Sequence, residues 1–407
     1  MASCPSFIPN SGPEIIMSPR DLIVDNQAAE RRTNARAGPA EARGQIARKS
    51  ILIVSRHDYR TKRRASVHFL ARSLVEAGHD VAFFSVGFSW LSRWRKDSRL
   101  ILNDRVNRWQ AIDGLRAFLW RTPWHAGGIP QAVRNLDWVF DLWARSRCAA
   151  LDEAAAGADI LLIDSGLPPV LIPRLRAIAP TAFLIYRAAD LLDTAGVHPR
   201  VQAVLDESAG EIDLIVVVAT AMLPHFAQFP CRKIVLPHGI PWDLFSVVRS
   251  NPFEDRTSNI VTVGSMLFDS RAVVTAAQAL PDWQFHLIGT PPGSYPDNVR
   301  QHAEMPFEQT LAYLHHADVG LAAYQRQGAP DYLSESSLKL LQFAALGLPA
   351  VCPDFAAGGP GQRFGYDPND PASIASAIVT AAGASRIPAP VMSWSDVAHR
   401  LMEAARE

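Results

Sequence analysis

Serine and lysine side chains gather where a helix is expected to begin, in the second half of the chain. In YLSESSLKLLQFAALGLPAVCPD, residues 332–354, Ser336 and Ser337 precede apolar residues at helical spacing. The free N–H groups and the partial positive charge of a helix N-terminus bind anions. Together with the serine hydroxyls and the Lys339 ammonium, they would receive a diphosphate. The alternative is a capped structural helix with a surface lysine.

Two aspartates follow expected strands and are candidate general bases. Asp190 ends the sequence LIYRAAD, and Asp164 lies in LLIDSG, so each comes just after an apolar run. A glycosyl transfer with inversion needs one carboxylate that takes the proton of the acceptor hydroxyl while its oxygen attacks the anomeric carbon. Either aspartate could serve. The structural alternative for both is a helix N-cap.

The sequence lacks the motif by which one class of glycosyl-transfer enzymes holds a metal–diphosphate complex. No two aspartates are separated by a single residue, so D-x-D is absent. The charge of a leaving diphosphate would then be met by the helix dipole and by cations, which matches the Ser-Ser-Leu-Lys element. The cysteines stand singly, without the C-x-x-C spacing of a zinc site. We therefore expect no bound metal.

A glycine follows another expected strand. VGSMLFD, residues 263–269, places Gly264 where the backbone could approach a nucleotide closely, although such turns are common in α/β proteins. The turn after the first strand is SRHDYR and contains no G-x-G-x-x-G, which weighs against a dinucleotide cofactor. GGPGQRFG, at 358–365, has the wrong spacing and is predicted to be a loop.

Two segments mix cations with aromatic residues. SRHDYRTKRRASVH, residues 55–68, carries five Lys or Arg, and FSWLSRWRKDSRL, residues 88–100, interleaves tryptophans with cations. Indole rings suit headgroup depth and cations are attracted to anionic lipid, so both segments favour a membrane surface. The alternative is a solvated charged face. The residues predicted for this acceptor or membrane surface are Arg56, His57, Asp58, Arg60, Lys62, Arg63, Arg64, Trp90 and Trp94.

Short apolar runs, separated by helix-length segments, must position these residues. Such alternation predicts parallel sheets covered on both faces. We predict two Rossmann-like, doubly wound domains, at 48–240 and 241–390, that face a central cleft. Residues 1–47 are predicted to be a disordered extension, and 391–407 a helix that packs back toward the first domain. The runs lie at 51–54, 81–84, 117–120, 160–163, 182–186, 214–218, 260–263, 285–288, 319–323 and 349–352.

Length and composition fit a two-domain globular protein. The 407 residues exceed what one core usually organises, and 48% are hydrophobic. The formal net charge is zero, which predicts no nucleic acid partner. No secretory signal pattern and no run of 18 apolar residues is visible, and the isolated cysteines favour a reducing cytosol.

These motifs together resemble the GumK family of bacterial glucuronosyltransferases, which act in xanthan-type exopolysaccharide assembly. The similarity covers nearly the whole chain after residue 50, in order and with similar spacing. It runs through SRHDYRTKRRASVHF, LWRT (119–122), YRAAD, GSMLFD, AEM (303–305), YLSESSLKLLQ, GLPAVCP, RFGY and WSD (394–396).

The resemblance implies an inverting, metal-independent GT-B enzyme without a cofactor. It implies transfer of glucuronate from UDP-glucuronate to the mannose of a polyprenyl-diphosphate-linked oligosaccharide. It also implies peripheral attachment to the cytoplasmic side of the bacterial inner membrane. Asp190 is similar to the family's catalytic base. Positions similar to its nucleotide-sugar contacts are Gly264, Met266, Glu304, Met305, Tyr324, Ser336, Ser337, Leu338, Lys339 and Gln342.

The residue types fit the roles that the resemblance implies. Glu304 would accept hydrogen bonds from ribose hydroxyls, Tyr324 would pack near the uracil, and Lys339 would neutralise the diphosphate or the donor carboxylate. Ala189, beside the base, and Ala303 depart from the family's pattern. Another UDP-sugar donor, a UDP-sugar epimerase on the same fold and a non-catalytic nucleotide-sugar-binding protein stay open.

Overall fold

The structure is a computed structural model. It describes residues 47–61, 64–94, 97–127, 129, 132–254 and 257–406. The extension predicted to be disordered lies outside these residues, apart from Ala47. Within them the chain forms two sheets, and we call the first sheet with its helices the first lobe (50–235) and the second the second lobe (259–382).

The first sheet has, within the described residues, eight strands in the order β3-β4-β2-β1-β5-β6-β7-β8. β3 pairs antiparallel with β4, and the other neighbours pair in parallel. The strands are β1 (Ser50–Ser55), β2 (Asp80–Ser89), β3 (Gln110–Ile112), β4 (Leu115–Thr122), β5 (Ile160–Asp164), β6 (Phe183–Ala188), β7 (Leu214–Val217) and β8 (Arg232–Val235).

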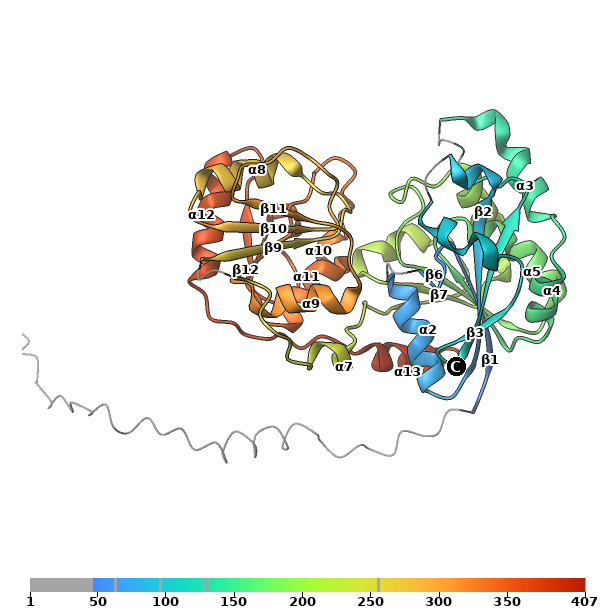
Figure 1. Cartoon of the computed structure of the whole chain (residues 1–407). Coiled ribbons are helices and arrows are strands. Elements are labelled where there is room, and N and C mark those ends of the chain that lie inside the picture. Colours follow the sequence, from blue (N-terminus) through green and yellow to red (C-terminus); the bar gives the residue numbers. More distant parts are fainter. Residues whose placement is uncertain are drawn as a thin grey trace, which may run out of the picture. The chain divides into compact units, whose positions relative to one another are not determined.

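Both faces of the first sheet are covered, as its nearly continuous apolar strands require. β1 and β5 are buried on both faces apart from the first residue of β1. Figure 1 shows α2 on the opposite face of the sheet from α4 and α5. The helices are α2 (Ser66–Glu76), α3 (Asp137–Ala144), α4 (Ala149–Ala156), α5 (Ile172–Ile178) and α6 (Pro199–Glu207), and α7 (Trp242–Phe245) follows the sheet.

The second sheet has, in the described part of the chain, six strands in the order β11-β10-β9-β12-β13-β14, all paired in parallel. The strands are β9 (Asn259–Val263), β10 (Gln284–Ile288), β11 (Val299–His302), β12 (Val319–Leu321), β13 (Ala350–Pro353) and β14 (Arg363–Tyr366).

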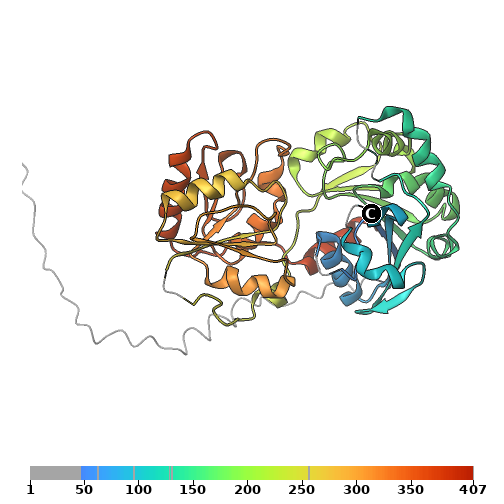
Figure 2. The ribbon, with the colours of Figure 1, turned by 45° about the horizontal axis from the view of Figure 1, so that its top comes forward.

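Apolar clusters cover the second sheet on both faces. One cluster joins the strands to α8 (Ser270–Ala279) and α12 (Pro371–Ala382). The other joins them to α9 (Phe307–His316) and α11 (Leu338–Ala345), which follows the short α10 (Leu333–Ser336). Figures 1 and 2 show α8 and α12 together, with α9 across the sheet.

The predicted apolar runs all form strands, but four strands have no such run. β3, β8, β11 and β14 lie at or near sheet edges, where fewer of their residues are buried. The interpretation of 358–365 as a loop is wrong at its end, because β14 begins at Arg363 and pairs with β13.

The terminal helix α13 (Trp394–Ala404) packs beside α2. Its buried face includes Trp394 and Leu401, and Ser393 and Asp396 cap its first turn. The chain crosses closely at Gly239, where a Cβ would lie 2.7 Å from the Trp394 nitrogen. A glycine at this position therefore allows segment 393–394 to reach the first lobe.

The strand order of each sheet reverses once, between β1 and β5 and between β9 and β12. In open α/β sheets, ligands bind at such a reversal, beyond the carboxyl ends of the strands. The loops after β1, β5 and β9 are therefore expected to form sites.

Candidate active site

A cavity of about 680 Å³ contains the predicted base and part of the predicted anion site. Its first-lobe wall comes from the loops after β1, β5 and β6. Its second-lobe wall includes Met266, which is 50% exposed, and Ser336 and Leu338. The volume falls within the range of about 300–1,000 Å³ usual for small-molecule sites.

Asp190 lines this cavity just beyond β6, with its side chain exposed toward it. No residue in the described part of the chain donates a hydrogen bond to its carboxylate. The surrounding protein partly removes it from water and thereby raises the pKa of Asp190 to about 6, and the negative charge of Asp164 adds to this rise. Arg187 and Arg56 oppose the rise. Asp190 is thus a carboxylate that is ionised at pH 7 and still basic enough to take a proton.

Asp164, the other candidate base, belongs to a buried network. Its Oδ2 accepts a hydrogen bond from Ser55 Oγ at 2.9 Å, and its Oδ1 accepts one from Arg187 Nη1 at 2.9 Å. Arg187 also donates to Ser66 Oγ at 2.9 Å, which ties β6 to the start of α2. Because both Asp164 oxygens are engaged in an ion pair that is nearly closed to solvent, the geometry favours Asp190 as the base.

The predicted helix start is present as the N-terminus of α11, and its N-cap Ser337 is buried against Tyr324. Ser337 caps α11 by accepting a hydrogen bond from the Leu340 N–H at 3.2 Å. Its hydroxyl also lies 2.6 Å from Tyr324 Oη. Both residues are 1% exposed, so Tyr324 supports the helix start from below and presents no open ring face to a base. Ser336 and Leu338 instead reach the cavity.

Among the described residues, the buried ammonium of Lys339 has no counter-ion. Its Nζ has no hydrogen-bond partner among the described residues and lies 4.9 Å from the centre of the Tyr324 ring. Burial lowers the pKa of Lys339 to about 8. Burial of a cation without a counter-charge is costly, and it favours an anion as the partner of Lys339. An anion beside the N-terminus of α11 would satisfy it.

The loop after β9 holds Met266 toward the cavity. Gly264 has φ +83° and donates its N–H to the Ile288 carbonyl at 2.8 Å. Leu267 has φ +51°, an uncommon conformation for a non-glycine residue. Gln325 fixes it by donating its N–H to the Leu267 carbonyl at 2.7 Å. Such strained backbone clusters at functional sites.

The remaining predicted nucleotide contacts lie in the second lobe and, like Gly264, Tyr324, Ser337 and Lys339, do not line the cavity. Glu304 is exposed beside Gly289, where a Cβ would come 3.8 Å from the Glu304 Cα. Met305 packs against the core, and Gln342 is half-buried on α11. The structure therefore does not bring these three residues to Asp190.

The basic segment after β1 turns inward. Arg56, His57 and Arg64 line the cavity. Arg60 forms a bidentate pair with Asp58, at 2.9 and 2.8 Å, and their side chains are 4% and 0% exposed. This buried pair therefore does not present its charges to a membrane, and Asp58 instead borders the cavity, where a role toward the acceptor stays a prediction. Lys62 and Arg63 lie outside the described residues.

The second aromatic segment is at the surface. Trp90 and Trp94 are 53% and 85% exposed. The guanidinium groups of Arg93 and Arg121 lie 5.2 and 4.9 Å from the Trp90 ring centre.

Helix α3 adds residues that the sequence analysis missed. Its Trp138 and Leu142 are 60% and 51% exposed. Their i, i+4 spacing, which places both on one helix face, was the available signal.

Tyr332 is a second missed residue, at the first position of the YLSESS motif. It comes from the second half of the chain, yet it is buried in the core of the first lobe. Its hydroxyl accepts a hydrogen bond from the Leu191 N–H at 3.0 Å and lies 2.7 Å from Thr194 Oγ1. Tyr332 therefore fixes the loop that follows Asp190.

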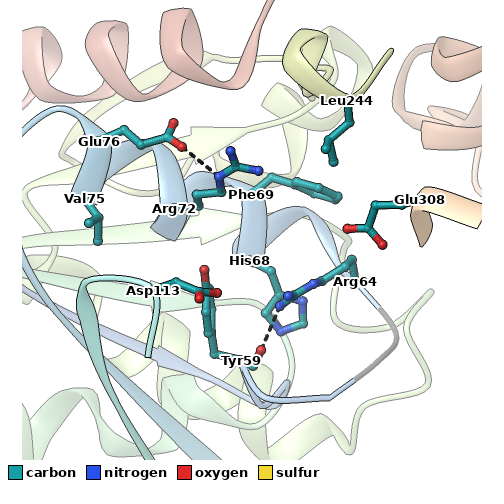
Figure 3. Close-up of a pocket in the computed structure, with 10 residues that line it drawn as sticks. All are labelled: Tyr59, Arg64, His68, Phe69, Arg72, Val75, Glu76, Asp113, Leu244 and Glu308. Atoms are coloured by element: carbon teal, nitrogen blue, oxygen red, sulfur yellow. Dashed lines mark hydrogen bonds and ion pairs between the residues drawn. The ribbon is translucent and has the colours of Figure 1, made fainter. Parts of the chain in front are cut away.

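A second cavity, of about 400 Å³, lies beside α2 (Figure 3). Figure 3 shows Arg72 directed to Glu76, at 2.7 Å, and a further nitrogen of Arg72 pairs with Asp243 at 2.8 Å. Arg64 donates to the Tyr59 carbonyl at 2.8 Å. Because both of these arginines are already engaged, unlike Lys339, we assign no reaction to this cavity.

Two further properties concern membranes and metals. No helix of the described residues has both the length and the apolar character needed to cross a bilayer. Among the same residues, no three His, Cys, Asp or Glu side chains are grouped as metal ligands.

Comparison with known proteins identifies a family. Residues 53–218 match the family model described as glucuronosyltransferase GumK, N-terminal domain. The chain is 35% identical over 373 residues to a UDP-glucuronate:glycolipid 2-beta-glucuronosyltransferase of Xanthomonas campestris pv. campestris. This alignment covers 90% of the chain and 92% of that relative.

Solved structures similar to the chain share its fold at low sequence identity. A sucrose-phosphate synthase from Thermosynechococcus elongatus matches with a TM-score of 0.59 at 14% identity, covering 88% of this chain and 95% of that one. Anabaena HepE, solved with UDP and glucose, matches with a TM-score of 0.57 at 12% identity, covering 87% and 95%. With the two Rossmann-like sheets, these similarities show the GT-B fold.

Proposed function

Because the chain belongs to the GumK family of glucuronosyltransferases, we propose that it transfers glucuronate from UDP-glucuronate to a glycolipid with inversion and without a metal ion. One observation carries the proposal. A cavity contains a carboxylate with a pKa of about 6, and beside it begins a helix whose first turn holds an unpaired buried ammonium.

Asp190 acts as the general base in this proposal. It takes the proton from an acceptor hydroxyl while the hydroxyl oxygen attacks the anomeric carbon of the donor. The new glycosidic C–O bond forms as the bond to the diphosphate breaks, and UDP leaves with the electron pair. Attack from the face opposite the leaving group inverts the anomeric configuration.

The charge of the leaving UDP is met by the protein. The first N–H groups of α11 have no partner within the helix and favour an anion. Lys339 adds a cation whose charge is held by no other described residue. The absence of D-x-D from the sequence also supports neutralisation of the diphosphate by the protein itself. This pair replaces the metal ion of other glycosyltransferases in our proposal.

The other predicted contacts complete the donor site. Met266, Ser336 and Leu338 lie on the cavity wall. We place the ribose near Glu304 and the diphosphate between Ser336 and Lys339. Gly264 leaves open space for the nucleotide, because no atom would lie within 4 Å of a Cβ added to it.

For the acceptor, we propose a mannose-terminated oligosaccharide on a polyprenyl diphosphate, at the cytoplasmic side of the bacterial inner membrane. The exposed Trp90, Trp94 and Trp138, with Arg93 beside Trp90, support peripheral binding to an anionic leaflet.

Vesicle sedimentation tests this membrane surface. The protein should sediment with phosphatidylglycerol vesicles at low salt, and the triple change of the three tryptophans to Ala should release it. Phosphatidylcholine vesicles provide the control. A wild-type protein that stays in the supernatant with anionic vesicles would show that these residues serve another purpose.

The reaction itself is tested with purified protein, UDP-glucuronate and a lipid extract or synthetic mannosyl lipid. We expect UDP release that depends on the acceptor. Parallel reactions with UDP-glucose, UDP-galactose and UDP-N-acetylglucosamine identify the donor. A new sugar formed from donor alone would indicate an epimerase, and UDP binding without release with any acceptor would indicate a binding protein.

A further inference from the structure

A smaller cavity of about 210 Å³ adjoins the cavity that contains Asp190. The two share five wall residues, which are Arg56, Asp97, Arg99, Gly166 and Ala195. The smaller cavity lies wholly in the first lobe, at the carboxyl ends of its strands. It is below the usual size for a drug-sized ligand and holds a unit no larger than about one sugar ring.

The walls combine apolar and polar groups in the way a sugar ring requires. Leu167, Phe140 and Ile129 provide an apolar side for the C–H face of a ring. Asp97 and His125 provide polar atoms for its hydroxyls, and the Asp97 side chain remains 20% exposed although it pairs with Arg99 at 2.7 Å. A site of this kind fixes a ligand by a few polar groups on a largely apolar wall.

Glycines keep this space open. Gly87 lies near the end of β2 and Gly127 in the loop after β4, and a Cβ at either would come 3.2 Å from Leu167 Cδ2. Gly166 would bring a Cβ 3.0 Å from Arg56 Cδ. Side chains at these positions would crowd the residues that form the wall.

The elements around the smaller cavity also carry the exposed aromatic residues. Ser92, in the turn Trp90–Arg93, and Phe140, in α3, line the cavity. The same two elements expose Trp90 and Trp138 to solvent. Figure 1 shows α3 at the first lobe, and the Trp143 Nε1 donates to Thr122 at the end of β4 at 3.3 Å, which places α3 at the carboxyl edge of the sheet.

The smaller cavity thus shares wall residues with the Asp190 cavity, and two elements that line it also expose tryptophans. We propose that the smaller cavity binds the second sugar of the acceptor glycan, the ring that precedes the mannose being modified, on the side of the lipid. This inference rests on the proposed function, because it assumes a lipid-linked glycan whose terminal hydroxyl reaches Asp190. It makes the enzyme selective for acceptors of two or more sugars.

Filling the cavity tests the proposal. Ile129 and Val197 are half-buried and line the smaller cavity but not the larger one, so Ile129→Trp and Val197→Phe fill it from two walls. Ile178→Trp is the matched control, because Ile178 is also half-buried but lies at the end of α5, away from both cavities. Thermal unfolding identifies a filling variant that fails to fold, and in that case the other filling variant provides the test.

Glucuronate transfer is measured to octyl α-mannoside and to octyl α-mannobioside. We expect both filling variants to raise KM for the two-ring acceptor by about tenfold or more, and to leave KM for the one-ring acceptor and for UDP-glucuronate unchanged. The Ile178→Trp variant should match the wild type. Equal losses for both acceptors, or no loss for the two-ring acceptor, would overturn the proposal.

A direct binding measurement separates this proposal from the proposed function. If the wild type transfers glucuronate to neither acceptor, saturation-transfer NMR with mannobiose still reports on the cavity. Binding by the wild type and by Ile178→Trp, but not by the filled variants, supports the sugar site. Absence of wild-type binding, or equal binding by the filled variants, contradicts it.

Discussion

The carboxyl ends of β5 and β6 each present an aspartate, and the two have opposite surroundings. Asp164 is buried and engaged on both oxygens by Ser55 and Arg187. Asp190, just beyond the neighbouring strand, is exposed and lacks a hydrogen-bond donor among the described residues, although both aspartates line the same cavity. The difference shows that the carboxyl end of a parallel strand brings a carboxylate to the site. The neighbouring side chains then decide whether that carboxylate supports the fold or is available to react.

The largest expected effect is on transfer by Asp190→Asn. The amide cannot accept the proton, so kcat should fall by about 10²- to 10⁴-fold, the usual contribution of a general base. Steady-state kinetics measure the loss, and calorimetry should show UDP binding unchanged. Retained turnover would remove Asp190 as the base.

Asp164→Asn should instead lower stability. Removing one partner of a buried ion pair leaves the Arg187 charge uncompensated, at a cost of about 3–5 kcal/mol in the free energy of unfolding. Denaturant unfolding measures this change in the free energy of unfolding. Asp152→Asn is the control, because Asp152 pairs with Arg174 at 2.8 Å but is 41% exposed, and its loss should cost about 0–1 kcal/mol. Equal effects would show that Asp164 is not structural.

Lys339→Met extends the comparison to an unpaired cation of the second lobe. The ammonium should contribute about 1.5–3 kcal/mol to UDP binding, so the Kd for UDP should rise by about 10- to 150-fold. Stability of the unliganded protein should not fall, because a buried unpaired charge is removed. Lys49→Met, at an exposed lysine, is the control. An unchanged Kd would place the diphosphate elsewhere.

The smallest effect is the response to pH. Because the pKa of Asp190 is raised to about 6, kcat/KM should fall roughly tenfold per pH unit below that value as the base becomes protonated. The sign for stability is opposite. A raised pKa stabilises the fold at low pH, and this contribution is lost as pH rises through about 6.

Thermal unfolding of Asp190→Asn checks that sign. The variant should lack this loss of stability, and should therefore melt above the wild type at pH 7 but not at pH 4. A wild-type kcat/KM that stays flat between pH 5 and 7 would contradict the assignment.

Much of the fold was predictable because central strands bury both faces. Runs such as 51–54 and 160–163 form β1 and β5, which are buried on both faces. The helix Trp394–Ala404 was evident from the helical spacing of its apolar residues. β14 was not predictable, because an edge strand that follows Gly and Pro has little apolar signal. Sheet order also depends on contacts between distant segments.

The site was predictable only as far as local sequence determines it. The start of α11 and the place of Asp190 after a strand follow from short motifs. The burial of Asp58 with Arg60 did not, because a run of charged residues looks the same whether it faces solvent or folds into paired side chains. The choice between Asp164 and Asp190 likewise required the partners of Arg187, which lie on other strands.

Tyr332 also determines how the molecule unfolds. Its ring fills part of the first-lobe core, although its own segment leads directly into α10 and α11. Helix α13, which follows the second lobe, similarly packs on α2 of the first. A chain ending near residue 240 would leave a hole in its core and an uncovered helix face. We therefore expect the two lobes to unfold in one cooperative transition, although each has a complete sheet.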